Sequence, residues 1–397
     1  MAPSATTSPF EPAPAGSWLS VDLRLLLVAL AFRVVTTIVG FLANVTIPPK
    51  LDQRFSLFRE PNAFWDTFAR YDSGWYYDIA TRGYAYVAGG RSNLAFFPLY
   101  PLLMRWGGQA LGGEQQHFYF AGIIVSWVAF AIAMVLLYRL ARLDLSHDGA
   151  LRGVSYAAVF PSAYFFGVVY TESLFFMSLV GAALALRTRR WGWAALAGAA
   201  LTATRVNGIM FVPALAVIAW QAAGASRDSR LRGLAAVAGG TLGLVGYCVY
   251  NYALSADPLA WYYSIQRWGY HPGGNPASGL LAIGRALLTR PYQFLSAEEM
   301  APYDTLNAGM AIAVILCLPA VWRRFGTAYA AIIVLGLILP LSTGQYEGLG
   351  RYCSVLFPVP LLLGSLRGEV RHLGLMASLA MLYSLGLSLF VNVHPLF

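Results

Sequence analysis

Repeated long apolar segments constrain the fold of this chain more than any other feature of its sequence. Apolar residues make up 58% of its 397 residues and charged residues only 11%, against roughly 45–50% and about 25% in soluble domains. One aqueous core cannot bury that much apolar surface, so the sequence predicts an all-α polytopic membrane protein with about 11 transmembrane helices. Several segments are shorter than the roughly 20 residues that span a bilayer, and two of them are expected to be broken or re-entrant. The apolar segments lie near residues 23–47, 118–138, 153–170, 172–186, 191–204, 205–223, 233–253, 306–322, 327–342, 353–366 and 372–391.

Arginines in the short connections indicate how the chain crosses the membrane. Every second connection is basic, and the positive-inside rule places such connections in the cytoplasm. The N-terminus is then cytoplasmic, the C-terminus is outside, and three longer segments lie outside: 48–117, 254–305 and 343–352. The basic connections contain Arg139, Arg142 and Arg152; Arg187, Arg189 and Arg190; Arg227, Arg230 and Arg232; Arg323 and Arg324; and Arg367 and Arg371.

These features predict a simple domain organisation. Residues 1–17 are rich in Pro, Ala, Ser and Thr and are expected to be a disordered cytoplasmic tail. Residues 18–397 are expected to form a single transmembrane domain, with a first outer loop at 48–117 and a second at 254–305. The net charge of +9 is carried almost entirely by arginine, since Lys50 is the only lysine. The preference for arginine over lysine, together with abundant Ala and Gly, suggests a GC-rich, prokaryote-like genome. We expect the protein to lie in a bacterial inner (plasma) membrane and its positive charge to reflect that location, with no nucleic-acid partner.

Motifs for nucleotide, metal or soluble-hydrolase chemistry are missing from the sequence. It contains no GxxxxGK[ST], no GxGxxG in a strand–helix setting, no HExxH and no GxSxG. The five histidines and three cysteines show no metal-ligand spacing. We therefore expect no cofactor and no metal, and we expect the donor substrate to be already activated when it binds. In a membrane, a polyprenyl-phosphate sugar fits this requirement.

The polar, aromatic stretch RYDSGWYYDIATRGY (Arg70 to Tyr84) supplies the candidate catalytic residue. Sugar transfer from a polyprenyl phosphate needs one carboxylate as general base, because the leaving phosphate scarcely needs an acid. We predict that Asp72, about 25 residues beyond the first apolar segment, is this base. Asp66 and Asp78 are alternatives, and Asp72 would otherwise serve only as the N-cap of a short helix from about Ser73 onward.

Three further motifs on the predicted outer side are expected to complete the site: FPSAYFFGVVYTES, TRVNG and GQYEGLGRYCSVLFP. Arg351, Arg205 and Arg70 are the candidates for binding the donor phosphate, although Arg205 and Arg351 could be interfacial anchors instead. Glu172 is expected to contact the sugar or to pair with one of these arginines. The outer aromatic residues would otherwise form an interfacial belt. The residues predicted to bind sugar or lipid are Trp75, Tyr76, Glu172, Asn207, Gln266, Trp268, Gln345 and Tyr352.

The motifs RYDSGWYYDIATRGY, AFFPLYP, FPSAYFF…YTESL and TRVNG, in this order, resemble the PIG-V family of GPI mannosyltransferase II and its bacterial relatives. The resemblance covers roughly residues 25–215, with weaker matches in WYYSIQRWG and GRYCSVLFP. That family belongs to the GT-C class of membrane glycosyltransferases, which use polyprenyl-phosphate sugars on the non-cytoplasmic side. The resemblance implies an inverting, polyprenyl-phosphate-mannose-dependent transfer without an obligatory metal, with Asp72 as the base. Tyr71 stands where the family often has tryptophan.

The sequence therefore predicts a GT-C fold whose first outer loop forms short amphipathic helices around 61–81 and 97–112. Its partners would be membrane lipids, a polyprenyl-phosphate sugar donor and a lipid-linked or cell-surface glycan acceptor. Two other functions remain open at this point. A ligase or phosphoglycosyl transferase with a lipid-diphosphate donor would require two or more arginines at one site. A non-catalytic transporter or flippase of lipid-linked sugar would require a charged path across the membrane.

Overall fold

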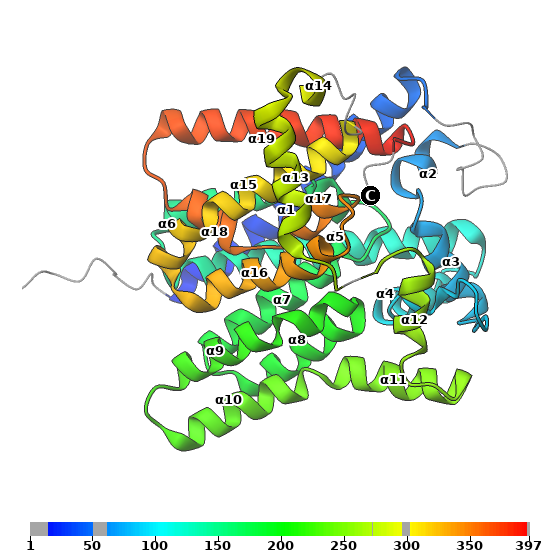
Figure 1. Ribbon diagram of the computed structural model, residues 1–397. Helices are drawn as coiled ribbons and strands as arrows, with labels where there is room; N and C mark the ends of the chain where they lie inside the picture. Colours follow the sequence, from blue (N-terminus) through cyan, green and yellow to red (C-terminus); the bar gives the residue numbers. More distant parts are fainter. Residues whose placement is uncertain (1–14, 51–61, 272, 296–301, 395–397) are drawn as a thin grey trace, which may run out of the picture.

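Apolar helices make up the body of the protein in the computed structural model, which describes residues 15–50, 62–271, 273–295 and 302–394 (Figure 1). These residues contain helices and no strands. Six helical segments are long and apolar enough to cross a membrane, which confirms the predicted α-helical membrane class but not the number of eleven spans. The segments are Ser20–Thr46, Gln115–Ala141, Val206–Ala223, Arg227–Ser255, Tyr303–Phe325 and Glu369–Val391.

The N-terminal boundary differs from the one predicted. Helix α1 (Ala15–Thr46) begins inside the stretch 1–17 that was expected to be a disordered tail, and residues 1–14 lie outside the described part of the chain. The three residues from Ala15 to Ser17 extend the apolar helix by nearly one turn.

The spans and the shorter helices between them make up most of the described chain. The long helix α5 packs against α1, α4 and α7, so it lies near the centre of the bundle. The helices are α5 (Gln115–Ala141), α7 (Glu172–Arg187), α8 (Trp191–Thr204), η4 (Val206–Phe211), α9 (Val212–Ala223), α10 (Arg227–Gly239), α11 (Leu242–Ser255), α12 (Ala260–Arg267), α13 (Pro276–Thr289), α14 (Pro291–Leu295), α15 (Pro302–Phe325), α16 (Thr327–Ser342) and α19 (Glu369–Val391).

Two of the predicted apolar segments are broken, as the sequence led us to expect. The segment near 153–170 contains the end of α6 (His147–Ala158) and the short helix η3 (Ala163–Phe166). The segment near 353–366 contains the end of α17 (Leu349–Ser354) and the short helix α18 (Pro358–Gly364). Pro161 lies in the first break and Pro358 begins α18 after the second, and a proline has no backbone N–H with which to continue the hydrogen bonds of the preceding helix. Neither segment crosses the bundle as one continuous helix.

The two broken segments pack against each other through small residues. A Cβ atom at Gly364 would lie 2.4 Å from the carbonyl oxygen of Gly149, and one at Gly153 would lie 3.3 Å from the carbonyl oxygen of Pro360. Helices α6 and α18 therefore meet almost backbone to backbone, which is the usual role of small residues spaced four apart in membrane proteins.

The first outer loop folds into the short helices that the sequence predicts. They are α2 (Ala63–Phe68), α3 (Ser73–Arg82), η2 (Asn93–Ala95) and α4 (Leu99–Ala110). Each buries one side: Phe68, Tyr76 and Tyr100 are among the residues packed in a common apolar cluster. These helices gather with α12 at the right-hand end of the bundle in Figure 1.

Helix α7 connects this end of the bundle to the opposite end. It begins at Glu172 and ends at Arg187, and it packs against α5 and α8. Arg187 donates to Asp144 (Nη2 to Oδ1, 2.9 Å), and Arg139 of α5 pairs with Asp22 of α1. The predicted cytoplasmic arginines near the end of α7 are thus about 24 Å along the helix from Glu172. Which end faces the cytoplasm remains a prediction.

Candidate active site

Asp72 lies in the sharp link between α2 and α3. The link requires a left-handed residue, Tyr71 (φ 48°), after which α3 begins at Ser73. Asp72 occupies the N-cap position of α3, yet its side chain makes no capping hydrogen bond. Instead, its Oδ2 accepts a hydrogen bond from Nη1 of Arg351 at 3.0 Å. The carboxylate is therefore directed toward a distant segment, which argues against a purely capping role.

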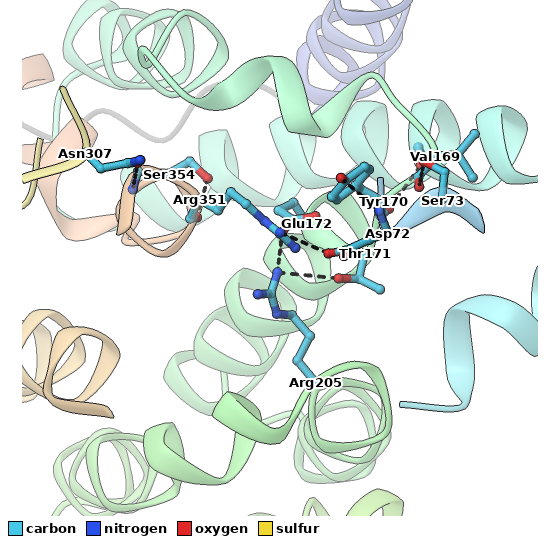
Figure 2. Close-up of polar contacts among 12 residues, drawn as sticks. Asp72, Ser73, Val169, Tyr170, Thr171, Glu172, Arg205, Asn307, Arg351 and Ser354 are labelled. Atoms are coloured by element: carbon cyan, nitrogen blue, oxygen red, sulfur yellow. Dashed lines mark hydrogen bonds and ion pairs between the residues drawn. The ribbon is translucent and has the colours of Figure 1, made fainter. Parts of the chain in front are cut away.

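A buried carboxylate, Glu172, joins two arginines beside Asp72. Its Oε1 accepts from Nε of Arg351 at 2.8 Å and also pairs with Nη1 of Arg205. Figure 2 shows both arginines reaching this carboxylate, Arg351 from α17 and Arg205 from the link between α8 and η4. Glu172 is fully buried, while the side chains of Arg351 and Arg205 are 10% and 16% exposed. We call Asp72, Glu172, Arg205 and Arg351 the charged cluster.

One oxygen of Asp72 remains open. Its side chain is 25% exposed, the largest exposed fraction in the charged cluster. Within the described part of the chain, Oδ1 has no hydrogen-bond or ion-pair partner, whereas Oδ2 is held by Arg351. The geometry thus leaves one carboxylate oxygen available to accept a proton from a bound hydroxyl.

Aromatic rings hold the guanidinium groups in place. The guanidinium carbon of Arg351 lies 4.8 Å from the ring centroid of Tyr170 and 5.1 Å from that of Phe165. The guanidinium carbon of Arg205 lies 5.1 Å from the ring centroid of Tyr352. Such cation–π contacts stabilise a desolvated cation without neutralising it. Both arginines consequently keep a full positive charge for an anionic ligand.

The backbone of the TRVNG motif explains the position of Arg205. Helix α8 ends there because Arg205 is extended (φ −154°, ψ 149°), and η4 then folds back against α8. A Cβ atom at Gly208 would lie 2.6 Å from the carbonyl oxygen of Leu201, so the close return needs glycine at this position. Asn207 is buried beside Arg205 and Arg351, where all three line a small void.

The predicted aromatic residues form one wall next to Asp72. The ring of Trp75 stacks on Phe96 with centroids 5.8 Å apart and meets Trp268 edge-on at 4.9 Å. Tyr76 is buried against Phe96, Tyr100 and Tyr170. Burial, and next the neighbouring Asp72 carboxylate, raise the pKa of the Tyr76 phenol, so it stays protonated.

Other predicted residues lie at the edge of this arrangement. Gln345 donates to the carbonyl oxygen of Gly269 at 3.2 Å and so connects the last outer loop to the second one. Tyr352 lies under Arg205, as described above. Gln266 lines a separate cavity between the first and second outer loops.

Arg70 and the alternative aspartates lie apart from the charged cluster. Arg70 pairs with Asp66 at 3.1 Å and donates to the carbonyl oxygen of Val391 at 2.9 Å, so it braces α2 against the end of α19. Asp78 pairs at 3.3 Å with the exposed Arg82 on the surface of α3. Neither contact brings these groups to Asp72.

Several supporting residues escaped the sequence analysis. The hydroxyl of Tyr170 accepts from the backbone N–H of Asp72 at 3.3 Å, and Ser73 donates to the carbonyl oxygen of Val169 at 3.0 Å. Asn307 of α15 accepts from the backbone N–H of Gly350 at 2.9 Å and so positions α17 beside Arg351. An isolated amide in an apolar helix was the available signal for Asn307.

Glu347 is a further carboxylate, outside the charged cluster but close enough to Asp72 and Arg351 to be affected by their charges. Burial raises its pKa, and the negative charges of Asp304 and Asp72 act in the same direction.

In the described part of the chain, no group of three or more His, Cys, Asp or Glu side chains is placed to hold a metal ion.

Comparisons with known proteins identify the family and the fold. The profile of the family described as mannosyltransferase (PIG-V) matches residues 18–226, a little more than half of the chain. Among solved structures, the protein is similar to ArnT from Cupriavidus metallidurans bound to undecaprenyl phosphate, with a TM-score of 0.50 and 12% identity, covering 96% of this chain and 77% of ArnT. It also matches the oligosaccharyltransferase AglB from Archaeoglobus fulgidus, in complex with an inhibitory peptide and a dolichol-phosphate, with a TM-score of 0.45 and 10% identity over 92% of this chain and 56% of AglB. No curated protein sequence matches the chain. The similarity to ArnT shows the GT-C fold.

Proposed function

The chain belongs to the mannosyltransferase (PIG-V) family, and from this premise we propose that it transfers mannose from a polyprenyl phosphate to a lipid-linked or cell-surface glycan. The observation that carries the proposal is the charged cluster, in which one open carboxylate lies beside two arginines joined by a buried glutamate. The site would face the outside of a bacterial inner membrane, in keeping with the arginine-rich connections on the other side.

The donor phosphate would bind to Arg351 and Arg205. The carboxylates of Asp72 and Glu172 balance these two guanidinium groups, so the charged cluster carries no net charge, and the single negative charge of a polyprenyl phosphodiester would take the place of Asp72 on Arg351. Arginine binds phosphate oxygens well because its planar group donates several hydrogen bonds in a fixed geometry. The phosphate would compete with Asp72 for Nη1 of Arg351 and thereby weaken the ion pair that holds Asp72.

Asp72 would act as the general base. Its free Oδ1 would take the proton from the acceptor hydroxyl. At the same time, the oxygen of that hydroxyl would bond to C1 of the mannose. The bond between C1 and the phosphate oxygen breaks, and the polyprenyl phosphate leaves with the bonding electrons. Attack from the face opposite the phosphate inverts the anomeric centre. A positioned general base contributes about 10²–10⁴-fold in rate.

The test compares two aspartates of the same helix region. Detergent-purified parent, Asp72→Asn and Asp78→Asn proteins would be given radiolabelled polyprenyl-phosphate mannose and extracted membrane acceptors. We expect Asp72→Asn to lose at least about 100-fold in transfer rate while still binding donor. Asp78→Asn should transfer normally, because the partners of Asp78 are the exposed Arg82 and the Asn93 amide, and neither belongs to the charged cluster. Transfer by Asp72→Asn at the parent rate would show that the base is another residue.

One observation also favours a lipid-diphosphate donor, because two arginines do converge on one site. The buried Glu172 neutralises one of them, and this is why we prefer the monophosphate. Competition separates the two donors: polyprenyl phosphate should inhibit transfer more strongly than polyprenyl diphosphate. Stronger inhibition by the diphosphate would instead support the ligase alternative.

A further inference from the structure

A cavity between the first and second outer loops is lined by none of the charged-cluster residues. Its volume is about 390 Å³, within the range of about 300–1,000 Å³ that is usual for small-molecule sites. It opens between α12 and the segment 86–92 of the first outer loop. These are two parts of the chain that the sequence analysis placed on the same side of the membrane.

The walls of the cavity are fixed by hydrogen bonds between the two outer loops. The carbonyl oxygen of Ser92 accepts from Oγ of Ser264 at 2.7 Å and from Nε1 of Trp268 at 3.0 Å. The carbonyl oxygen of Arg267 accepts from Nε of Arg91 at 3.3 Å. Ser92 and Ser264 are buried, so these hydrogen bonds are shielded from water and hold the two loops together at the base of the cavity.

Trp268 connects the cavity to the helix that follows Asp72. Its Nε1 donates to the carbonyl oxygen of Ser92, which lines the cavity, and its ring meets Trp75, which lies about one helical turn after Asp72. The arginines of the charged cluster do not line the cavity. A molecule held here would therefore contact residues other than the proposed phosphate-binding arginines.

The lining of the cavity combines aromatic rings with hydrogen-bond donors. Tyr86 and Tyr263, which are 45% and 51% exposed, provide apolar faces at the rim, and Gln266 provides a neutral amide. Arg267 and His271 add donors with positive or partly positive character. None of the described lining residues carries a carboxylate. Aromatic faces with amide and hydroxyl groups suit a sugar, and the uncompensated arginine suits an anion on it.

We propose that this cavity binds the headgroup of the acceptor, and that this headgroup is an anionic carbohydrate carrying a phosphate or a carboxylate. The assignment rests on the proposed transferase function, because it names the acceptor of that reaction. Arg267 would bind the anionic group, while Tyr86, Tyr263 and Gln266 would contact the sugar ring.

The experiment measures binding of small probes to the full-length protein in detergent by calorimetry. Mannose 6-phosphate is the probe, with mannose and inorganic phosphate as comparisons. The variants are Arg267→Gln and, as a matched control, Arg285→Gln, which removes an exposed arginine of α13 that does not line the cavity. Binding of polyprenyl phosphate is measured on each protein, and Asp72→Asn is included because it tests the reaction and not this cavity.

We expect mannose 6-phosphate to bind the parent protein more tightly than mannose or inorganic phosphate does. Arg267→Gln should weaken its binding about 10-fold or more, since a charge-assisted hydrogen bond is lost. Arg285→Gln and Asp72→Asn should bind it as the parent does, and polyprenyl phosphate binding should be unchanged in Arg267→Gln. The proposal is overturned if the parent does not bind the probe, or if Arg267→Gln binds it equally well. Equal binding of mannose overturns the anionic part, and equal binding of inorganic phosphate overturns the sugar part. A failure of the transferase proposal would appear separately, as full transfer activity in Asp72→Asn.

Discussion

Replacing Glu172 by glutamine is the most informative single change in the charged cluster. The side chain keeps its size and an acceptor oxygen, but the negative charge between Arg351 and Arg205 is lost. Arg351 retains its contact with Asp72. Arg205 keeps only neutral neighbours within hydrogen-bond distance, such as the Thr171 hydroxyl at 3.5 Å.

The expected cost follows from this burial. Glu172 is fully buried and the Arg205 side chain is 16% exposed, so water cannot replace the lost charge. Removing one partner of a buried ion pair costs about 3–5 kcal/mol in the free energy of unfolding, and we take about 3 kcal/mol because glutamine still accepts a hydrogen bond. One kcal/mol shifts Tm by about 2–4 °C in domains of 150–250 residues and by less in longer chains. A decrease of about 4–6 °C is therefore expected for Glu172→Gln.

The assay is thermal unfolding of the detergent-purified protein, followed by tryptophan fluorescence with and without inorganic phosphate. The variant leaves Arg205 without its carboxylate partner, so this guanidinium can bind a small anion, and an anion that binds only the folded state raises Tm. Phosphate should therefore recover part of the lost stability in Glu172→Gln and change the parent protein much less.

The control is Asp228→Asn, which removes a carboxylate from a comparable pair with Arg232. That pair has an N–O distance of 3.0 Å, but its side chains are 66% and 71% exposed. Exposed ion pairs contribute about 0–1 kcal/mol, so the control should melt close to the parent. If Glu172→Gln also melts within about 1 °C of the parent and ignores phosphate, the charged cluster does not hold its arginines in the way argued here.

Three further predictions concern other parts of the molecule. Gly243→Ala should destabilise the protein by about 1–3 kcal/mol, because the new Cβ would lie 2.1 Å from the carbonyl oxygen of Ala199; Gly246→Ala on the same helix has nothing within 4 Å and should be neutral or stabilising in the same unfolding assay. The pKa of Glu347 is raised in the folded protein, so its favourable contribution to the free energy of unfolding is complete below the ordinary pKa of 4.5 and is lost as the pH rises through the folded pKa. A plot of Tm against pH should therefore be flatter over that window for Glu347→Gln, and an unchanged curve would contradict this. Arg33→Met should melt no lower than the parent despite losing two hydrogen bonds, because within the described part of the chain Nε and Nη2 of this fully buried guanidinium have no hydrogen-bond partner, and methionine can still pack against the Phe32 and Phe130 rings that the guanidinium covers; a clear loss of stability would show that the buried charge is favourable.

Much of the fold could be predicted because membrane burial is recorded locally in the sequence. The apolar segments indicated the α-helical class, and the short helices expected around 61–81 and 97–112 of the first outer loop correspond to α2, α3 and α4. The number of spans could not be obtained this way. Helices α6 and α18 are stable as short pieces because they pack against each other through glycines, and hydropathy alone does not contain that contact.

The candidate site was predictable as a set of residues but not as an arrangement. The distribution of arginines placed Asp72, Glu172, Arg205 and Arg351 on the same side of the membrane, and the structure brings these four together. Arg70 lies only two positions before Asp72 in the sequence, but it pairs with Asp66 and donates a hydrogen bond to the end of α19. Proximity along the chain was therefore a poor guide to contact.

The sequence by itself determined that this is an α-helical membrane protein, and it supplied the carboxylates and arginines predicted to lie on one side. Only the tertiary structure decided that Arg351 contacts Asp72, 279 positions away, and Glu172, 179 positions away. The physical reason is that apolar burial depends on each segment separately, whereas a buried charge is stable only beside partners that the packing of distant helices supplies.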